Sequence, residues 1–452
     1  MFKMLFDDFV TTTRRSEGSR PLLLESPPQY VDMKSPSLHS AHAKNYFTFQ
    51  PTPHWSTSRP KFSTTALNTQ FFRRHVAQLA VMGLLATILI ACLTLVMLFE
   101  PIHAVYIPGP NDAHVYTAAV ANFPLITAAQ REAEVSIFMP VKKSECSSEC
   151  DKLYMPASVA RDSDTQFFGN TSSGVFDKMK YKACCGSSQS FDASKVPLVF
   201  MEPQVGTSRF LYSTLARFMS ANGMAVVLID HPDSSSENGL DPFTDLKVWN
   251  NTVTKTIDTR IQDIKFVLQK LGDVSLLKQQ FPSLKFSTPF DPNSYSIVGH
   301  GIGGATATTL SVLDRRVRFS INLSGSAPLL RMPTYSSIYF FGRSDFRREN
   351  DIHWPTTWKY LAGRATEWDF KNAGLFDFSD LPRIVDLARK DDTIDIGDVK
   401  GLRDSLGPFG FDVNACYLEA YLKAELTEPK YGYVGDCFRL FDQMQPYPGG
   451  VH

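Results

Sequence analysis

The segment from Tyr295 to Thr306 constrains the fold of this chain more than any other stretch. A short apolar run, Tyr295–Val298, leads into Gly299-His300-Gly301-Ile302-Gly303-Gly304, and a pattern of small helix-forming residues follows. Glycine tolerates positive φ angles, so a strand can turn sharply here and enter a helix at once. The segment therefore predicts a strand, a tight turn and a helix in direct succession.

Short apolar runs alternate with helical patterns over most of the remaining chain. Nearly continuous apolar runs are typical of strands buried on both faces of a parallel sheet. The alternation predicts an α/β domain with a doubly wound, mostly parallel sheet. The runs that we interpret as strands are 135–139, 197–201, 225–229, 296–298, 319–323, 338–341 and 367–370, and the helical patterns include 210–221, 259–271 and 305–313.

The turn has the spacing of the nucleophile elbow of α/β-hydrolases, Gly-x-Ser-x-Gly, which raises a serine hydroxyl above the sheet. Gly299 and Gly303 hold the flanking positions, but the nucleophile position is Gly301. Glycine has no side chain that could attack an ester. It also relieves the backbone strain of an elbow, on the order of 1–3 kcal/mol. We expect an α/β-hydrolase fold without its nucleophile.

The residues around this turn resemble one family, the platelet-activating-factor acetylhydrolases, which are secreted and intracellular lipid esterases. That family carries Gly-His-Ser-Phe-Gly-Gly-Ala-Thr, which Gly299–Thr306 matches except at Gly301 and Ile302. The resemblance covers residues 134–425 and implies, for an intact member, hydrolysis of carboxylic esters of lipids. Segments similar to its first core strand and helix, its Glu-His-Arg-Asp stretch and its closing helix are 197–206 with 211–213 and 221–223, 229–233, and 416–425.

Carried over by position, the resemblance places the family's catalytic acid at Ser324 and its histidine at Ala373. A hydrolase triad runs serine, acid, histidine along the chain. No histidine lies between His353 and the terminal His452, so the general base has no candidate in the right place.

The family's oxyanion loop corresponds to residues 201–206, where two residues are unfavourable. Pro203 lacks an amide hydrogen, and Glu202 adds a negative charge near a developing oxyanion. His300, Glu202 and Asp345 are the candidates for a residual pocket, with Asp345 following an apolar strand as the acid of many hydrolases does. Ser324 and Ser326 are alternative, displaced nucleophiles, but nothing nearby in the sequence would activate them.

A second feature is the uncharged apolar stretch Leu79–Phe99. At about 1.5 Å per residue it spans roughly 31 Å as a helix, close to the hydrocarbon thickness of a bilayer. Arg73 and Arg74 precede it and Glu100 follows, so the positive-inside rule predicts a cytosolic N-terminus. We expect a single-pass signal anchor with the large domain luminal or extracellular, in the secretory or endolysosomal pathway. The alternative is the mitochondrial inner membrane with the domain in the intermembrane space.

The cysteines favour an oxidising compartment. Six of seven follow the apolar stretch, which predicts three disulfides there, with neighbouring Cys184 and Cys185 joined to different partners. Within the C-terminal segment we expect Cys416 to pair with Cys437. The remaining two are Cys146 and Cys150, whose spacing suits a disulfide better than a metal site. Glycosylation sequons occur at Asn170, Asn250 and Asn322.

The domain boundaries follow from these features. We predict a disordered tail at 1–74, an anchor at 75–99, a stalk at 100–133, the hydrolase-like domain at 134–425 and a C-terminal extension at 426–452. The tail contains Pro27-Pro28-Gln29-Tyr30, the PPxY form read by WW domains. Acidic and basic residues balance at 46 each, so nothing indicates nucleic acid as a partner. The sequence predicts neither a metal nor a cofactor.

Three hypotheses on function follow. The first is a catalytically inactive, membrane-anchored hydrolase fold that serves as a binding, scaffold or assembly module and whose old pocket is open to a lipid ligand. The second is an active carboxylic ester or phospholipid esterase with a rearranged site. The third is a structural subunit of a larger membrane complex, in which the old pocket is filled. The space above Gly301 distinguishes the first from the third.

Overall fold

A computed structural model describes residues 79–90, 104–127, 131–169, 174–231, 249–402, 405–427 and 432–451. The chain divides into two compact units, Met1–Thr87 and Ile88–His452. The second unit holds the sheet and the candidate site. The predicted tail with Pro27, Pro28 and Tyr30, and the sequon at Asn170, lie outside the described residues.

The predicted membrane anchor is described only in its first part. Residues 79–90 are helical, whereas 91–99 lie outside the described residues. In the part of the chain that the structure describes, no helix combines the length and the apolar character needed to cross a membrane. The membrane-spanning helix therefore stays a prediction.

The predicted α/β sheet is confirmed. Within the described residues it has nine strands in the order β14-β13-β12-β11-β10-β7-β8-β3-β2. The six strands from β13 to β8 pair in parallel, and β2, β3 and β14 add antiparallel edges. The strands are β2 (Tyr116–Ile126), β3 (Glu132–Lys142), β7 (Leu198–Glu202), β8 (Ala225–Asp230), β10 (Tyr295–His300), β11 (Val317–Leu323), β12 (Ser337–Arg343), β13 (Ala365–Phe370) and β14 (Met444–Val451).

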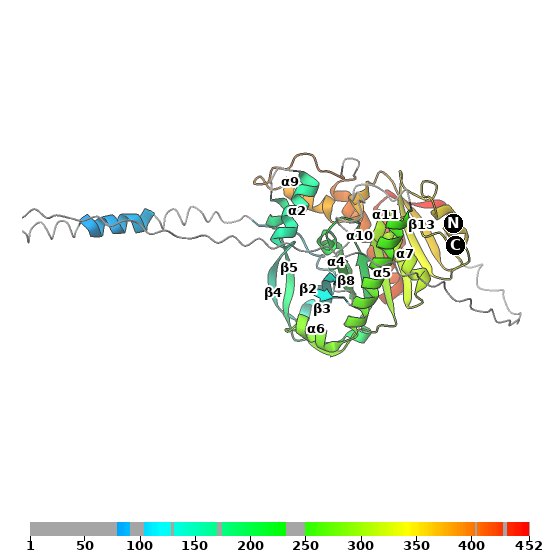
Figure 1. Ribbon diagram of the computed structural model, residues 1–452, viewed down its shortest axis with the longest axis horizontal. Helices are drawn as coiled ribbons and strands as arrows, with labels where there is room; N and C mark the ends of the chain where they lie inside the picture. Colours follow the sequence, from blue (N-terminus) through cyan, green and yellow to red (C-terminus); the bar gives the residue numbers. More distant parts are fainter. Residues whose placement is uncertain are drawn as a thin grey trace, which may run out of the picture. The chain divides into compact units, whose positions relative to one another are not determined.

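Helices cover both faces of the sheet (Figure 1). Strand side chains alternate between two cores: Val199 and Met201 belong to one, and Leu198 and Phe200 to the other. The first core includes helices α2 (Ala157–Phe168), α4 (Ser213–Ala221), α9 (Leu381–Arg389) and α10 (Pro408–Leu422), and the second includes α5 (Asn251–Leu271), α6 (Val274–Gln280) and α7 (Ile302–Leu313). Shorter or peripheral helices are α3 (Val175–Lys178), α8 (Trp354–Lys359) and α11 (Gly432–Leu440).

Two predicted boundaries differ from the structure. The stalk at 100–133 includes β2, which pairs with β3 along its whole length and buries Ala118 and Phe123. The extension at 426–452 includes β14, which pairs with β13. Both segments belong to the sheet because their backbone groups pair with those of β3 and β13, whose outer edges would otherwise lack hydrogen-bond partners within the sheet. The domain therefore begins before 134 and continues past 425.

The disulfides agree with the predicted partners. Cys416 of α10 is joined to Cys437 of α11. Cys184 and Cys185 pair with Cys146 and Cys150 respectively, so the neighbours have different partners. These two bonds link β4 (Cys146–Leu153) to β5 (Met179–Ser187) in a small sheet that also contains β1 (Val105–Tyr106), while β6 (Ser190–Asp192) and β9 (Lys285–Thr288) form a separate pair.

The sequon at Asn322 is not a glycosylation site in the folded domain, so that expectation is wrong. Asn322 is fully buried in β11, and its amide nitrogen donates to Thr308 Oγ1 at 2.9 Å. Its Oδ1 accepts from the Gly325 amide at 2.7 Å. A glycan on this nitrogen would break the internal bonds of a packed site. Asn250 is exposed at the start of α5 and stays a prediction.

Candidate functional site

Gly301 lies in the expected elbow, between the end of β10 and the start of α7. Its φ is +56°, a conformation that residues with a side chain rarely adopt. Its amide donates to Leu323 O at 2.9 Å, which ties the turn to the end of β11. Gly299 and Gly303 flank it in close contact, because a Cβ on Gly299 would lie 2.0 Å from Gly303 O. The backbone is that of a nucleophile elbow, without the nucleophile.

The side chain of Gln204 occupies the place next to Gly301. A Cβ built on Gly301 would lie 2.0 Å from Gln204 Oε1. That oxygen accepts the amide of Ile302 at 2.9 Å and the amide of Val205 at 3.1 Å. In α/β-hydrolases the oxyanion hole is made by the amide after the nucleophile and an amide from the loop after the strand that β7 represents here. Gln204 therefore holds an uncharged oxygen where a substrate oxyanion would bind.

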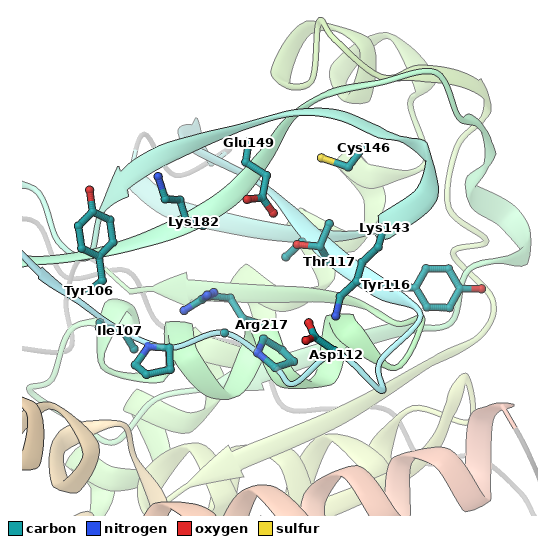
Figure 2. A pocket seen from close by; sticks show the side chains of 14 residues that line it. Tyr106, Ile107, Asp112, Tyr116, Thr117, Lys143, Cys146, Glu149, Lys182 and Arg217 are labelled. Atoms are coloured by element: carbon teal, nitrogen blue, oxygen red, sulfur yellow. The ribbon is translucent and has the colours of Figure 1, made fainter.

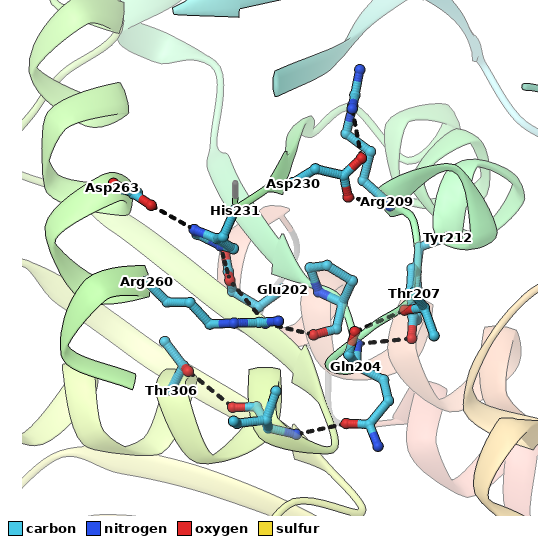
Figure 3. Close-up of polar contacts among 12 residues, drawn as sticks. Glu202, Gln204, Thr207, Arg209, Tyr212, Asp230, His231, Arg260, Asp263 and Thr306 are labelled. Carbon is cyan, nitrogen blue, oxygen red and sulfur yellow. Dashed lines mark hydrogen bonds and ion pairs between the residues drawn. The ribbon is translucent and has the colours of Figure 1, made fainter. Parts of the chain in front are cut away.

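Gln204 is fixed by a buried chain of hydrogen bonds. The backbone amide of Gln204 donates to the Tyr212 hydroxyl at 3.0 Å (Figure 3). The Tyr212 hydroxyl in turn lies 2.7 Å from His300 Nδ1. Burial, assisted by the nearby Arg343 guanidinium, lowers the pKa of His300 to about 3. His300 is thus a buried, neutral imidazole bonded to a tyrosine beside the turn, and its packing role stays a prediction.

A cation, Arg343, contacts the position that the resemblance assigns to the catalytic acid. Ser324 follows β11 with φ of +55°, and its hydroxyl accepts from Arg343 Nη1 at 2.7 Å. Arg343 Nε also donates to Asp345 Oδ1 at 2.9 Å. Arg343 is buried, whereas 71% of the Asp345 side chain is exposed. Asp345 thus lies in the loop after β12, and its exposed carboxylate balances the charge of Arg343.

The remaining candidates form no triad. Ala373 is buried after β13 and has no titratable group. The Ser326 hydroxyl donates to Asp351 rather than to a histidine. The ring of His353 lies 5.1 Å from that of Trp249, by centroids. Neither displaced serine therefore bonds to a histidine through any described hydrogen bond.

Glu202 belongs to a buried group of charges instead of facing the turn. His231 Nε2 lies 2.8 Å from Glu202 Oε2, and His231 Nδ1 lies 2.9 Å from Asp263 Oδ2. Arg260 donates to the carbonyl of Pro203 at 2.7 Å and lies 3.6 Å from Glu202 (Figure 3). Burial would lower the pKa of His231, but the two carboxylates outweigh it and the pKa is raised. The cluster stabilises the loop that carries Gln204, and the expected repulsion from Glu202 is compensated.

No family model matches this chain. It is 24% identical over 346 residues to a protein of the fungus Arthroderma benhamiae named "Probable 1-alkyl-2-acetylglycerophosphocholine esterase", a match that covers 69% of this chain and 80% of the relative. A solved ferulic acid esterase from Streptomyces cinnamoneus superposes with a TM-score of 0.52 at 20% identity, over 76% of this chain and 99% of the esterase.

The domain has an α/β-hydrolase fold. The solved esterase supports the fold alone at this identity. The fungal relative is named as an esterase of the lipid class that the motif at Gly299–Thr306 resembles. The resemblance of the chain to esterases is therefore found in both sequence and fold.

Sequence reasoning missed Gln204 and Arg343. Gln204 lies in the loop 201–206, which attracts attention in the sequence only through Pro203 and Glu202. Its contact with Gly301 is a tertiary contact between residues far apart in the chain, so no signal in the sequence marked it. Arg343 ends an apolar strand directly before Asp345, and a charged residue at the carboxyl end of a parallel strand was the signal there.

Proposed function

We propose that this chain is a membrane-anchored protein whose hydrolase-fold domain is catalytically inactive and serves as a binding, scaffold or assembly module. The observation that carries the proposal is the acceptance of the Ile302 and Val205 amides by Gln204 Oε1. Ester hydrolysis needs these donors free for the oxyanion, which is worth about 3–4 kcal/mol of transition-state stabilisation per donor. They are engaged by the protein itself. The Gln204 side chain also fills the place next to Gly301, so the role that we propose is scaffolding or assembly rather than binding of a lipid at the elbow. A filled pocket equally suits the structural-subunit hypothesis, which the partner experiment below separates.

Two further requirements of the reaction point the same way. The elbow presents Gly301, so no hydroxyl is available for attack there. The acid position presents a hydroxyl bonded to a guanidinium, and a cation at this place would disfavour a protonated histidine. Nucleophile, acid and oxyanion donors are thus each replaced, and the three replacements support inactivity independently.

The second candidate function is an active carboxylic ester hydrolase with a rearranged site. It is favoured by the names of the two similar proteins, both of which are called esterases. Within this candidate Ser326 is the residue to test, because its buried hydroxyl bonds to Asp351.

Covalent labelling distinguishes the two candidates. Purified full-length protein is treated with a fluorophosphonate probe, and hydrolysis of p-nitrophenyl acetate and of a 1-alkyl-2-acetylglycerophosphocholine is measured in parallel. We expect no labelling and no turnover above buffer. Gln204→Ala frees the Ile302 and Val205 amides and is expected to remain inactive. Labelling that is lost in Ser326→Ala would establish the rearranged site and overturn the proposal.

The anchoring and location are part of the proposal. The uncharged stretch 79–99 supports a membrane anchor, and three disulfides beyond it support an oxidising compartment. Protease treatment of sealed vesicles should remove residues 1–74 and leave the domain intact. Digestion of the domain with protection of the tail would reverse the topology. Fractionation separates the secretory or endolysosomal route from the mitochondrial inner membrane.

The partners of the proposed module are open to a direct test. Native electrophoresis of gently solubilised membranes distinguishes a scaffold that exchanges partners from a structural subunit of a stable complex. A stable complex of constant composition would favour the structural subunit. Loss of an interaction in Tyr30→Ala would assign it to the PPxY segment of the tail.

A further inference from the structure

A cavity of about 650 Å³ lies between the small disulfide-linked sheet and α4. Its volume is within the usual range of small-molecule sites, roughly 300–1,000 Å³. Its lining is separate from the elbow and includes neither Gly301 nor Gln204. The charged and aromatic lining residues are Tyr106, Asp112, Tyr116, Lys143, Glu149, Lys182 and Arg217 (Figure 2).

Arg217 distinguishes this cavity from a surface hollow. It lies on α4 with 4% of its surface exposed, and its buried Nη1 has no hydrogen-bond partner among the described residues. Its guanidinium stacks on the Tyr181 ring at 4.7 Å. Burial lowers the pKa of Arg217, although Asp380 and the cavity-lining Glu149 attract its charge. Neither carboxylate forms a described hydrogen bond with the guanidinium, and a buried charge is costly without such bonds. An anion in the cavity would add a hydrogen-bonding partner to the part of the guanidinium that lines it.

Two lysines approach the same space from other sides (Figure 2). Lys143 Nζ donates to Asn111 O at 2.9 Å, and Lys182 Nζ lies 2.5 Å from Asp151 Oδ1. An ammonium has three donors, so both lysines retain capacity for a ligand. Donors from several directions suit a phosphate group, whose oxygens can accept from more sides than those of a carboxylate.

Two acidic residues, Asp112 and Glu149, also line the cavity and limit the charge that it accepts. Asp112 and Glu149 are both exposed, whereas Arg217 is buried. Their carboxylates would repel a polyphosphate more strongly than a single phosphate, because the repulsion grows with the charge of the ligand. The same two carboxylates would attract a cationic group, so a ligand that carries both a phosphate and a cation would be favoured further.

We propose that this cavity binds a small molecule or lipid headgroup with a single phosphate group, seated on Arg217. The site goes beyond the proposed scaffold role and does not depend on the elbow. Lys143 and Lys182 contribute long-range attraction, and Glu149 sets the selectivity against multiply charged ligands.

Isothermal titration of the full-length protein in detergent tests the site with inorganic phosphate, glycerol 3-phosphate, glycerophosphocholine and dihexanoylphosphatidylcholine. We expect saturable 1:1 binding of at least one of them. Binding of the lipid or glycerophosphocholine alone assigns a headgroup site, and binding of inorganic phosphate assigns a free-phosphate site. Arg217→Met should weaken binding at least about tenfold, whereas Arg161→Met, an exposed arginine of α2, should leave it unchanged.

A second variant keeps the test independent of the buried arginine. Glu149→Gln removes an exposed negative charge from the lining, and it should tighten binding of the same ligand several-fold without changing the melting temperature. Absence of binding by all four compounds at roughly 10 mM, where even a site with a Kd of about 1 mM would be largely occupied, overturns the proposal. Undiminished affinity in folded Arg217→Met overturns it as well.

Discussion

Replacing Gly301 by serine should destabilise the domain rather than rebuild an enzyme. The first cost is backbone strain, because a residue with a side chain at φ of +56° and ψ of −118° loses about 1–3 kcal/mol. The second is displacement of Gln204, whose Oε1 lies 2.0 Å from the new Cβ. Moving it leaves the buried Ile302 amide without its acceptor, at about 1–3 kcal/mol. The expected loss in free energy of unfolding is about 2–6 kcal/mol.

Two glycines in open space provide matched controls. Gly174 also has φ of +56°, but no atom of the described residues lies within 4 Å of the place that a Cβ would take, so Gly174→Ser measures strain without the clash. Its ψ of 42° lies in the left-handed helical region, which makes this a lower bound on strain. Gly397 is exposed, has open space and needs no positive φ, so Gly397→Ser should be nearly neutral.

A double-mutant cycle isolates the contact with Gln204. Gln204→Ala removes the acceptor of the Ile302 amide by itself, so the Gly301→Ser/Gln204→Ala variant should lose about 1–3 kcal/mol less than the sum of the single changes. Urea unfolding followed by tryptophan fluorescence measures all variants. The reasoning would be refuted if Gly301→Ser lowered the free energy of unfolding no more than Gly174→Ser. Strictly additive losses in the cycle would refute it as well.

Three other outcomes follow from the same geometry. The variant Gly301→Ser/Ser324→Asp/Ala373→His should stay without esterase activity, because Arg343 would pair with the new aspartate; turnover of p-nitrophenyl acetate would contradict this. His231 has a raised pKa in the folded protein. Its ion pairs therefore stabilise the fold fully below the pKa of an unfolded histidine, about 6.5. This stabilisation is lost as pH rises through the pKa of His231 in the folded protein. Melting temperatures from pH 6 to pH 9 should therefore fall more in the parent than in His231→Gln. Removing the Cys416–Cys437 bond by a double serine change should cost about 3 kcal/mol in urea unfolding, given a sequence separation of 21 residues, and an unchanged midpoint would show that the C-terminal helices need no link.

The local sequence pattern did not predict β2 and β14, the two edge strands of the sheet. The segment Tyr116–Ile126 contains several alanines and a proline and follows an apolar stretch, so the sequence favours a stalk there. Its strand conformation depends on pairing with β3, a contact that no window of sequence contains. The same applies to β14, whose run Met444–Val451 includes two prolines and two glycines and is a strand because β13 lies beside it.

The sequence alone determined the layered sheet, the elbow and the glycine at the nucleophile position of that elbow. Buried strands and crossover helices leave periodic apolar signals, and a close turn such as Gly299–Gly303 admits only glycine at its contacts. Only the tertiary structure decided which side chains contact Gly301 and Ser324. Gln204, Ile302, Ser324 and Arg343 lie on different elements, and their hydrogen bonds exist because the parallel strands end at one edge of the sheet. Residues far apart in the sequence carry no local mark of such contacts.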